Sequence, residues 1–416
     1  MKKFAVLGFG TVGSGVVELF YRNRQKIEEK ANTQMELAYI LDLREFPGSP
    51  YEDKFTKSID TILADSEVSV VAECMGGVEP AFTYLMQCLN RGISVVSSNK
   101  ELIAQKGAEM LAAAKAHSCN CFFEASVGGA IPIIRPLHRC LAANEITEID
   151  GILNGTTNYI LNKMLTDGMD YETALARAQK HGYAEREPSA DVDGHDACRK
   201  ICILSSLAFG KHVYPASVYT RGIREISLED ASAANALRGA VKLIASVRRL
   251  ADGRILPAVM PMFVPHANML SHVDGVFNCV QVCGDAIDRA YFCGRGAGKF
   301  PTASAMMGDV IEAAKSEGTV LSQDWVDTGS QDFVAGIDEL ECGMFIRYEE
   351  QPDTVKSCNF FAKTVSQLCG ADAEVTTAAN GCHIANTLTK AQRDSLLDAA
   401  KAAGYSILHW MPALKA

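Results

Sequence analysis

The sequence predicts an α/β protein with a doubly wound parallel sheet, followed by a mixed α+β domain and a small C-terminal module. Short apolar runs alternate with segments of helical periodicity over residues 1–130, which favours a parallel sheet covered on both faces. A glycine-rich turn separates the first apolar run from the first helical segment. From residue 340 onward the expected order is βαββαβ, which indicates a separate module.

The first domain is expected to span residues 1–130, with residues of about 300–320 returning to it. Its expected strands are 3–7, 36–41, 68–72 and 93–97, and its expected helices are 15–27, 81–91, 107–117 and 303–315. This order is typical of a Rossmann-type dinucleotide-binding domain.

Residues 131–299 are expected to form the mixed α+β domain. The expected elements are a strand at 145–153, helices at 158–167, 171–181 and 194–209, and several short strands within 256–292. The C-terminal module, residues 340–416, has expected strands at 344–349, near 373, near 383 and at 405–409, and helices at 355–368 and 389–403.

Composition excludes several classes of function. The formal net charge is -10, so the overall field does not steer the chain to nucleic acid or to an anionic membrane. We find no apolar stretch of the ~20 residues that a membrane helix needs. The N-terminus runs into a strand without a signal peptide, so we expect a cytoplasmic protein whose 14 cysteines are largely reduced thiols.

The glycine-rich turn is Gly8-Phe9-Gly10-Thr11-Val12-Gly13, which follows a predicted strand and opens a helix. Its glycines permit a tight turn, and the helix N-terminus offers N–H groups to a pyrophosphate, so the pattern predicts nucleotide binding. The alternative is a turn without a ligand. Asp42, after the second strand, favours the free 2′-hydroxyl of NAD, whereas Arg44 suits the 2′-phosphate of NADP, and the choice stays open.

Three further turns are candidate ligand sites. Ser98 and Lys100 follow a predicted strand and are candidate cofactor contacts. Lys100 can also meet a substrate carboxylate or carbonyl, or else be a solvated surface residue. Residues 124–132 combine the Glu124 carboxylate with a small-residue turn whose carbonyls suit a hard cation, or form an interdomain crossover without an ion. Residues 294–303 form a second glycine-rich turn that either touches the cofactor or acts as a hinge.

Residues 154–158, Asn-Gly-Thr-Thr-Asn, follow a strand and precede a helix. Thr156 or Thr157 is expected to cap that helix, and the hydroxyls and amides are equally suited to binding a substrate.

An acidic run is the most informative segment. Five carboxylates precede one lysine, Lys200, and they belong to Glu185, Glu187, Asp191, Asp193 and Asp196. Asp196 and Lys200 are four apart at a helix start and share a face, which by itself predicts only an ion pair worth roughly 0.2–0.5 kcal/mol. The density of acid upstream suits a substrate that carries an ammonium group, and the lysine would supply the proton that a reduced aldehyde needs.

Taken together and in order, these stretches resemble homoserine dehydrogenases over about residues 1–320. The matching stretches are GFGTVG, SSNKELIA, EASVGGAIPII, GILNGTTNYIL, EREPSADVDGHDACRK and GAGKFPTASA. The resemblance implies reversible, NAD(P)H-dependent reduction of L-aspartate 4-semialdehyde to L-homoserine. It also implies a substrate-binding and dimerisation domain at 131–299 and a homo-oligomer, a dimer or a tetramer.

The resemblance also implies roles for individual residues. Lys200 would donate the proton, Asp196 would orient it, Glu185 and Asp191 would receive the substrate ammonium group, and Lys100 would lie where substrate and nicotinamide meet. Cofactor contacts are implied for Phe9, Thr11, Val12 and Gly298. Glu124 and the carbonyls of Val127, Gly129 and Ile131 match a sodium-like cation site.

The sequence departs from the family pattern in places. Glu187 and Ala190 replace an aspartate and a polar residue that are usual there, and Arg186 is an added charge. The C-terminal module resembles an ACT domain of monofunctional members, but Asp353 stands where a glycine usually lies, which argues against threonine feedback. One rival hypothesis is another amino-acid dehydrogenase, which turnover of homoserine against other amino alcohols distinguishes. The other is a non-catalytic sensor, which the effect of Lys200→Ala distinguishes.

Overall fold

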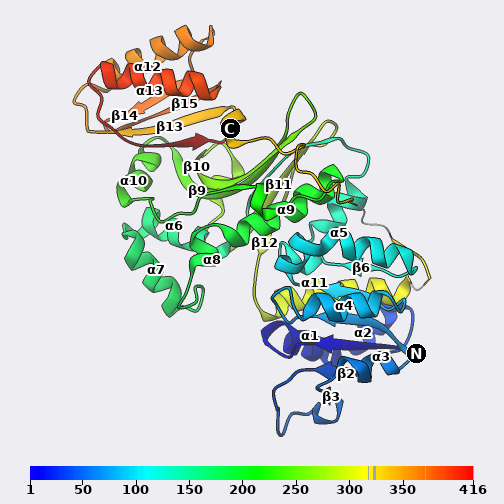
Figure 1. The fold of residues 1–416 in the computed structure, drawn as a ribbon. Coiled ribbons are helices and arrows are strands. Elements are labelled where there is room, and N and C mark those ends of the chain that lie inside the picture. The colour runs from blue at the N-terminus through cyan, green and yellow to red at the C-terminus, as the bar shows by residue number, and fades with distance from the viewer. Residues whose placement is uncertain (317, 322–324, 371, 416) are drawn as a thin grey trace. The chain divides into compact units, whose positions relative to one another are not determined.

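The computed structural model describes residues 1–316, 318–321, 325–370 and 372–415. The chain divides into two compact units. The first unit consists of Met1–Ile146, Arg199–Ser217 and Gly284–Gln331, and the second unit of Thr147–Cys198, Val218–Cys283 and Asp332–Ala416. Figure 1 shows the chain coloured along its length.

The first unit is built on a parallel sheet with the strand order β3-β2-β1-β4-β5-β6. Its strands are β1 (Lys2–Leu7), β2 (Met35–Leu41), β3 (Phe55–Thr56), β4 (Val68–Glu73), β5 (Ser94–Ser97) and β6 (Cys121–Phe122). This is the strand order of a Rossmann domain, and it confirms the expected fold class. The order reverses between β1 and β4, where such sheets bind their ligands.

Helices cover this sheet, and several of them differ from the sequence expectation. The helices are α1 (Thr11–Arg22), α2 (Arg24–Ala31), α3 (Ile59–Ala64), α4 (Ala81–Leu89), α5 (Lys100–Ala116) and α11 (Lys299–Lys315). The expected single helix at 15–27 is two helices that meet at Asn23. Helix α5 begins at Lys100 rather than at residue 107, because the Asn99 side chain caps it by accepting the N–H of Leu102.

The returning helix α11 packs against α1, as expected for the segment near 300–320 (Figure 1). A Cβ at Gly15 of α1 would lie 2.9 Å from the carbonyl oxygen of Lys299, so only glycine permits this approach. Buried apolar side chains from both helices and from β1 share one core, among them Phe4, Phe20 and Val310. The late segment is therefore an integral part of the first unit.

The second unit holds a mixed sheet in which β11, β7, β9, β10, β16, β13, β15 and β14 follow one another. The central pair is antiparallel and long: β9 (Gly239–Arg249) and β10 (Ile255–Pro265) pair along their whole length. The neighbouring strands are β7 (Ile146–Ile152), β11 (Phe277–Gly284) and β8 (Tyr219–Thr220), and β12 (Asp288–Arg295) follows β11 in the chain. Strand β9 was not predicted, because both of its faces are buried and its residues do not alternate in polarity.

The helices of the middle region lie close to their predicted positions. They are α6 (Gly155–Asp167), α7 (Tyr171–Lys180), the short α8 (Ser189–Val192), α9 (His195–Phe209) and α10 (Leu228–Ala236). Helices α8 and α10 were not predicted. Helix α10 opens with a capping box in which Ser227 and Asp230 each satisfy a backbone N–H of the other.

The C-terminal segment has the predicted βαββαβ order. Its elements are β13 (Cys342–Tyr348), α12 (Thr354–Cys369), β14 (Val375–Ala378), β15 (Gly381–Leu388), α13 (Lys390–Ala402) and β16 (Ile407–Ala413). In Figure 1 the two helices cover one face of these strands, and Tyr348, Phe361 and Leu396 lie in the core between them. The segment belongs to the second unit, because β16 pairs with β10. The expected division into three domains stays a prediction.

Among the described residues, none of the helices has both the length and the apolar character that crossing a membrane requires.

Candidate functional site

In the first unit, the carboxyl ends of four parallel strands bring the predicted nucleotide-binding residues to one edge of the sheet. Gly8 follows β1, Asp42 follows β2, Glu73 ends β4 and Ser97 ends β5. Parallel sheets of this order bind their ligands at this edge. The fold therefore gathers residues that are far apart in the sequence.

The glycine-rich turn has the geometry that its sequence predicts. Gly8 has a φ of +91°, which a residue with a side chain rarely adopts. A Cβ at Gly13 would lie 1.8 Å from the carbonyl oxygen of Gly8, so the turn closes only with glycine there. A Cβ at Gly10, the residue before α1, would meet open space. The first N–H groups of α1 lack partners within the helix. The turn leaves this N-terminus open to a ligand.

Asp42 and Arg44, the two candidates for reading the ribose, form an ion pair with each other. The Arg44 guanidinium lies 2.8 and 3.0 Å from the two Asp42 carboxylate oxygens. The same carboxylate accepts the Phe9 backbone N–H at 2.8 Å, so it braces the glycine-rich turn. The Arg44 hydrogen bonds hold the pKa of Asp42 well below its usual range. Asp42 is buried, whereas the Arg44 side chain is 62% exposed.

Sequence reasoning missed Glu73, a fully buried carboxylate at the end of β4. Its oxygens accept the Met75 N–H at 2.6 Å, the Gly76 N–H at 3.2 Å and the Ser97 hydroxyl at 2.6 Å. Burial raises its pKa. The signal was an acidic residue that ends an apolar run, two residues short of a pair of glycines. Glu73 shapes the loop after β4 and ties it to the end of β5.

Lys100 is the first residue of α5 and is half-buried. Its neighbour Glu101 forms an ion pair with Arg199 at 2.9 Å, and Arg199 precedes Lys200 in helix α9. The start of α5 and this part of α9 therefore touch within the first unit. Ser98, also predicted as a cofactor contact, donates its backbone N–H to the Glu73 carbonyl. Gly298, the last predicted cofactor contact, has a φ of +119° and caps α11.

The Glu124 carboxylate is occupied by protein donors. It accepts the backbone N–H groups of Ile133, Ile134 and Arg135 at 2.6, 2.8 and 2.9 Å. The Arg135 guanidinium lies 3.6 Å away and also pairs with the buried Asp309. Backbone N–H groups therefore reach both oxygens of this carboxylate, and the cation site expected at residues 124–131 stays a prediction. Among the described residues no group of three or more His, Cys, Asp or Glu is arranged to hold a metal.

The five carboxylates of the acidic run do not all meet in the second unit. Asp193 pairs with Arg224, whose guanidinium lies 3.1 Å from one carboxylate oxygen. Glu187 accepts the N–H and the hydroxyl of Ser189, and Glu185 is exposed at the surface. These three carboxylates are thus engaged in local structure or face solvent.

The remaining two carboxylates of the run, Asp191 and Asp196, meet at one amide. The Asn154 side-chain nitrogen donates to Asp191 at 2.7 Å and to Asp196 at 2.9 Å. Asp196 lies in the first turn of α9, and Lys200, only 7% exposed, lies one turn further along the same helix. The helix therefore carries the predicted proton donor and its partner on one face.

Asn154 itself was not predicted as a site residue. It also caps α6, because its side-chain oxygen accepts the Thr157 N–H at 2.8 Å. The expectation that Thr156 or Thr157 caps this helix is wrong. The Thr156 hydroxyl donates instead to the Tyr183 carbonyl at 2.6 Å. An asparagine between a strand and a helix was the available signal.

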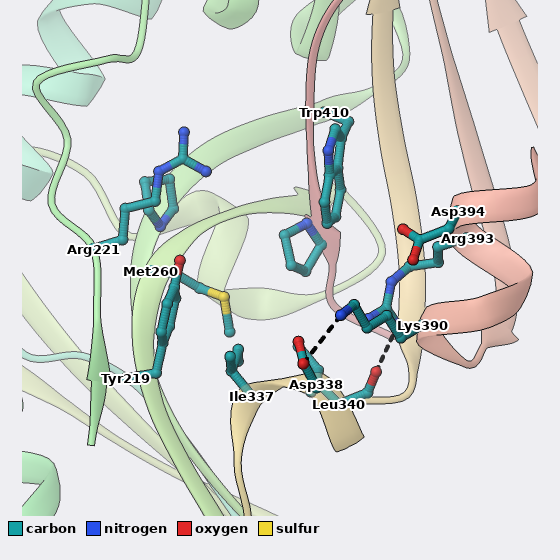
Figure 2. Close-up of a pocket in the computed structure, with 12 residues that line it drawn as sticks. Tyr219, Arg221, Met260, Ile337, Asp338, Leu340, Lys390, Arg393, Asp394 and Trp410 are labelled. Atoms are coloured by element: carbon teal, nitrogen blue, oxygen red, sulfur yellow. Dashed lines mark hydrogen bonds and ion pairs between the residues drawn. The ribbon is translucent and has the colours of Figure 1, made fainter. Parts of the chain in front are cut away.

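A cavity of about 200 Å³ lies elsewhere in the second unit, beside the C-terminal segment. In Figure 2 the side chains of Met260 and Trp410 face it. Lys390 and Asp338 form an ion pair of 3.0 Å at its rim, and Arg393 donates to the Leu340 carbonyl at 2.5 Å. None of the predicted site residues lines this cavity.

The fold and these residues define a class of protein. A parallel sheet of this order, with a glycine-rich turn and a paired acidic residue after β2, is that of NAD(P)-binding oxidoreductases. Two family models match the chain: the homoserine dehydrogenase NAD-binding domain over residues 8–124 and homoserine dehydrogenase over residues 132–311.

Curated relatives and solved structures are also homoserine dehydrogenases. The homoserine dehydrogenase of Lactococcus lactis is 38% identical over 75% of this chain and 74% of its own length. That of Mycobacterium tuberculosis is 41% identical over 75% of this chain and 72% of its own length. The solved homoserine dehydrogenase of Thiobacillus denitrificans superposes with a TM-score of 0.85 at 27% identity, covering 100% of this chain and 98% of that one. The chain belongs to the homoserine dehydrogenase family.

Proposed function

We propose that this protein interconverts L-aspartate 4-semialdehyde and L-homoserine with NAD(P)H or NAD(P)⁺. The observation that carries the proposal is the pair of carboxylates held by Asn154, one on α8 and one in the first turn of α9, with Lys200 one turn further along α9. It occurs in a chain whose fold includes a complete dinucleotide turn. An ammonium-bearing aldehyde is the substrate class that this charge pattern suits.

The chain's own residues would bind the substrate and handle the proton. The bound nicotinamide supplies the hydride. As negative charge grows on the aldehyde oxygen, Lys200 neutralises it by donating a proton from its ammonium group, directly or through water. Asp196, on the same helix face, orients the lysine. In the oxidative direction Lys200 takes the hydroxyl proton back.

Substrate recognition would come from opposite charges. Asp191 and Glu185 receive the substrate ammonium group, with Asp191 preorganised by Asn154 and Glu185 free to approach from the surface. Lys100 meets the substrate carboxylate or carbonyl from the start of α5. No cysteine nucleophile is needed, and burial raises the pKa of the Cys88 thiol to about 12, which keeps it protonated.

The cofactor would lie on the glycine-rich turn. The proposed contacts are Gly8, Phe9, Gly10, Thr11, Val12, Gly13, Asp42, Arg44, Ser98, Lys100 and Gly298. The pair of Asp42 and Arg44 supports use of NADP(H) as well as NAD(H), because the guanidinium offsets the carboxylate charge that would repel a 2′-phosphate. A solved relative, a hyperthermophilic archaeal homoserine dehydrogenase in complex with NADPH, is 27% identical with a TM-score of 0.63 over 75% of this chain and 98% of that one.

Three further parts of the proposal concern the surroundings of the site. A sodium-like cation would be held by main-chain carbonyls of Glu124, Val127, Gly129 and Ile131. The mixed sheet would support a homodimer or a tetramer. The C-terminal βαββαβ segment would act as an ACT-like regulatory module in a cytoplasmic enzyme.

The deciding experiment is steady-state oxidation of L-homoserine with NAD⁺ and with NADP⁺. We expect turnover by the parent chain and a fall in kcat of about 100-fold or more in Lys200→Ala, since general acid–base groups contribute 10²–10⁴-fold. Binding of the reduced cofactor, followed by its fluorescence, should persist in that variant. Lys180→Ala, at the exposed end of α7, is the matched control and should keep parental kinetics. Unchanged homoserine oxidation in Lys200→Ala would rule out the assigned proton donor.

A further inference from the structure

We propose that Asn154 is a positioning residue that holds Asp191 and Asp196 together as one preorganised pair. Its side-chain nitrogen lies 2.7 Å from an Asp191 oxygen and 2.9 Å from an Asp196 oxygen. A primary amide carries two N–H donors, so one nitrogen can serve both carboxylates at once. The catalytic meaning of the pair rests on the proposed function, whereas the bridge itself rests on these contacts.

The chemistry around Asn154 determines which way its amide faces. The side-chain oxygen accepts the Thr157 backbone N–H at 2.8 Å, and a backbone N–H can only donate. The other end faces two carboxylates, which accept when they are ionised. The opposite orientation would set an oxygen against two carboxylate oxygens. The amide is therefore anchored at the start of α6 with its donors directed at the acids.

Together with the Lys200 ammonium group one turn along α9, the bridge offsets the repulsion between the two carboxylates. Two carboxylates that share one site repel each other, and one of them then tends to take up a proton. A neutral double donor between them favours the charged form of both, because hydrogen bonds to a carboxylate stabilise its ionised state. Asn154 and Asp196 are buried, so water screens this repulsion poorly.

The bridge also links three elements that are separate in the sequence. Asn154 precedes α6, Asp191 belongs to the short helix α8, and Asp196 lies in the first turn of α9. Holding both carboxylates from the rigid start of α6 limits their rotation about their own side-chain bonds. Small errors of position in an active site are costly, since a misplacement of about 1 Å can lower the rate about 100-fold.

The test uses two variants that keep the helix cap. In Asn154→Ser the hydroxyl still caps α6 but reaches neither carboxylate, and in Asn154→Asp a near-isosteric carboxylate replaces the two donors. We expect kcat for homoserine oxidation to fall at least tenfold in Asn154→Ser, with a smaller change in the KM for NADP⁺. Asn154→Asp should also move the acid limb of the kcat/KM profile upward by about a pH unit or more, since a third carboxylate favours protonation.

A control separates positioning from stability. Asp170 caps α7 by accepting the Thr173 N–H at 2.7 Å, and it is exposed. Asp170→Ala should lose the cap alone and keep parental kcat and the parental pH profile at temperatures where the chain is folded.

The outcomes distinguish this inference from the proposed function. A parent chain that does not oxidise homoserine overturns the proposed function and, with it, the catalytic role given to the bridge. Positioning predicts a tenfold change in kcat and a shift of a full pH unit. The bridge alone is overturned if the parent is active and a folded Asn154→Ser variant stays close to it. Close means within about threefold in kcat and about 0.3 pH units in the pH profile.

Discussion

At the scale of single residues, we propose that the pair of Asp42 and Arg44 meets the ribose end of the cofactor. The sequence left two hypotheses, an aspartate that favours NAD and an arginine that favours NADP. The structure joins them in one ion pair, so neither side chain acts alone. Arg44 also stands 5.2 Å over the Phe46 ring, which steadies its guanidinium beside the turn.

This pair yields a prediction about cofactor preference. In Arg44→Ala the Asp42 carboxylate keeps its charge but loses its counter-ion, so a 2′-phosphate would be repelled. We expect the KM for NADP⁺ to rise about tenfold or more while the KM for NAD⁺ changes little, as measured by steady-state kinetics with each cofactor. Arg22→Ala, at the far end of α1, is the control. An equal rise in both KM values would contradict this role of Arg44.

At the scale of elements, a buried carboxylate joins helix α10 to the C-terminal segment. One Asp230 oxygen accepts from the Arg347 guanidinium of β13 at 2.6 Å, and the other lies 3.0 Å from the His409 ring of β16. Burial alone would raise the pKa of Asp230, but its hydrogen bonds with His409, the Ser227 N–H and Arg347 lower it to about 2. The carboxylate is thus held in its charged form.

The Asp230 contacts predict how stability responds to acid. Because the pKa of Asp230 is lower in the folded state than in the unfolded chain, its ionised form stabilises the fold above about pH 4. That stabilisation is lost as the pH falls from about 4 towards 2. We expect Asp230→Asn to lower the free energy of unfolding by about 2 kcal/mol at pH 7 and to flatten its slope between pH 4 and 2, measured by urea denaturation.

The control for this experiment is Asp398→Asn, an exposed position on α13. It should change the free energy of unfolding by less than about 0.5 kcal/mol. A parental slope below pH 4 in Asp230→Asn would mean that other carboxylates carry the acid sensitivity.

At the scale of the whole molecule, the C-terminal βαββαβ segment shares a sheet with the middle of the chain. Strand β16 pairs with β10, and the Phe263 and Phe345 rings stack with centroids 5.5 Å apart. If the C-terminal segment is removed, the strand that it pairs with becomes an exposed sheet edge, and the ring that it packs against is uncovered. The segment is therefore continuous with the core of the second unit.

This continuity predicts the result of truncation. A chain that ends at residue 336 should aggregate or unfold at a lower temperature, because the edge of β10 and the Phe263 ring would face water. Size-exclusion chromatography and thermal denaturation of the shortened chain beside the full chain measure this. A monodisperse truncated chain with the parental melting temperature would show instead that the segment is an independent module.

The sequence by itself determined the alternation that builds the parallel sheet, the glycine-rich turn, the βαββαβ order and the family. These depend on local chemistry: the period of apolar residues, the backbone freedom of glycine, and motifs that are short and contiguous. The same local logic placed Asp196 and Lys200 on one helix face.

Only the tertiary structure decided which acids of the run from Glu185 to Asp196 belong together. Asp193 and Glu187 are taken by Arg224 and Ser189, whereas Asp191 and Asp196 share Asn154. It likewise showed that the Glu124 carboxylate accepts three backbone N–H groups. The hydrogen-bond partners of a charged side chain often lie far away in the sequence. A buried charge must be paired, so the spacing of residues along the chain cannot by itself assign its partner.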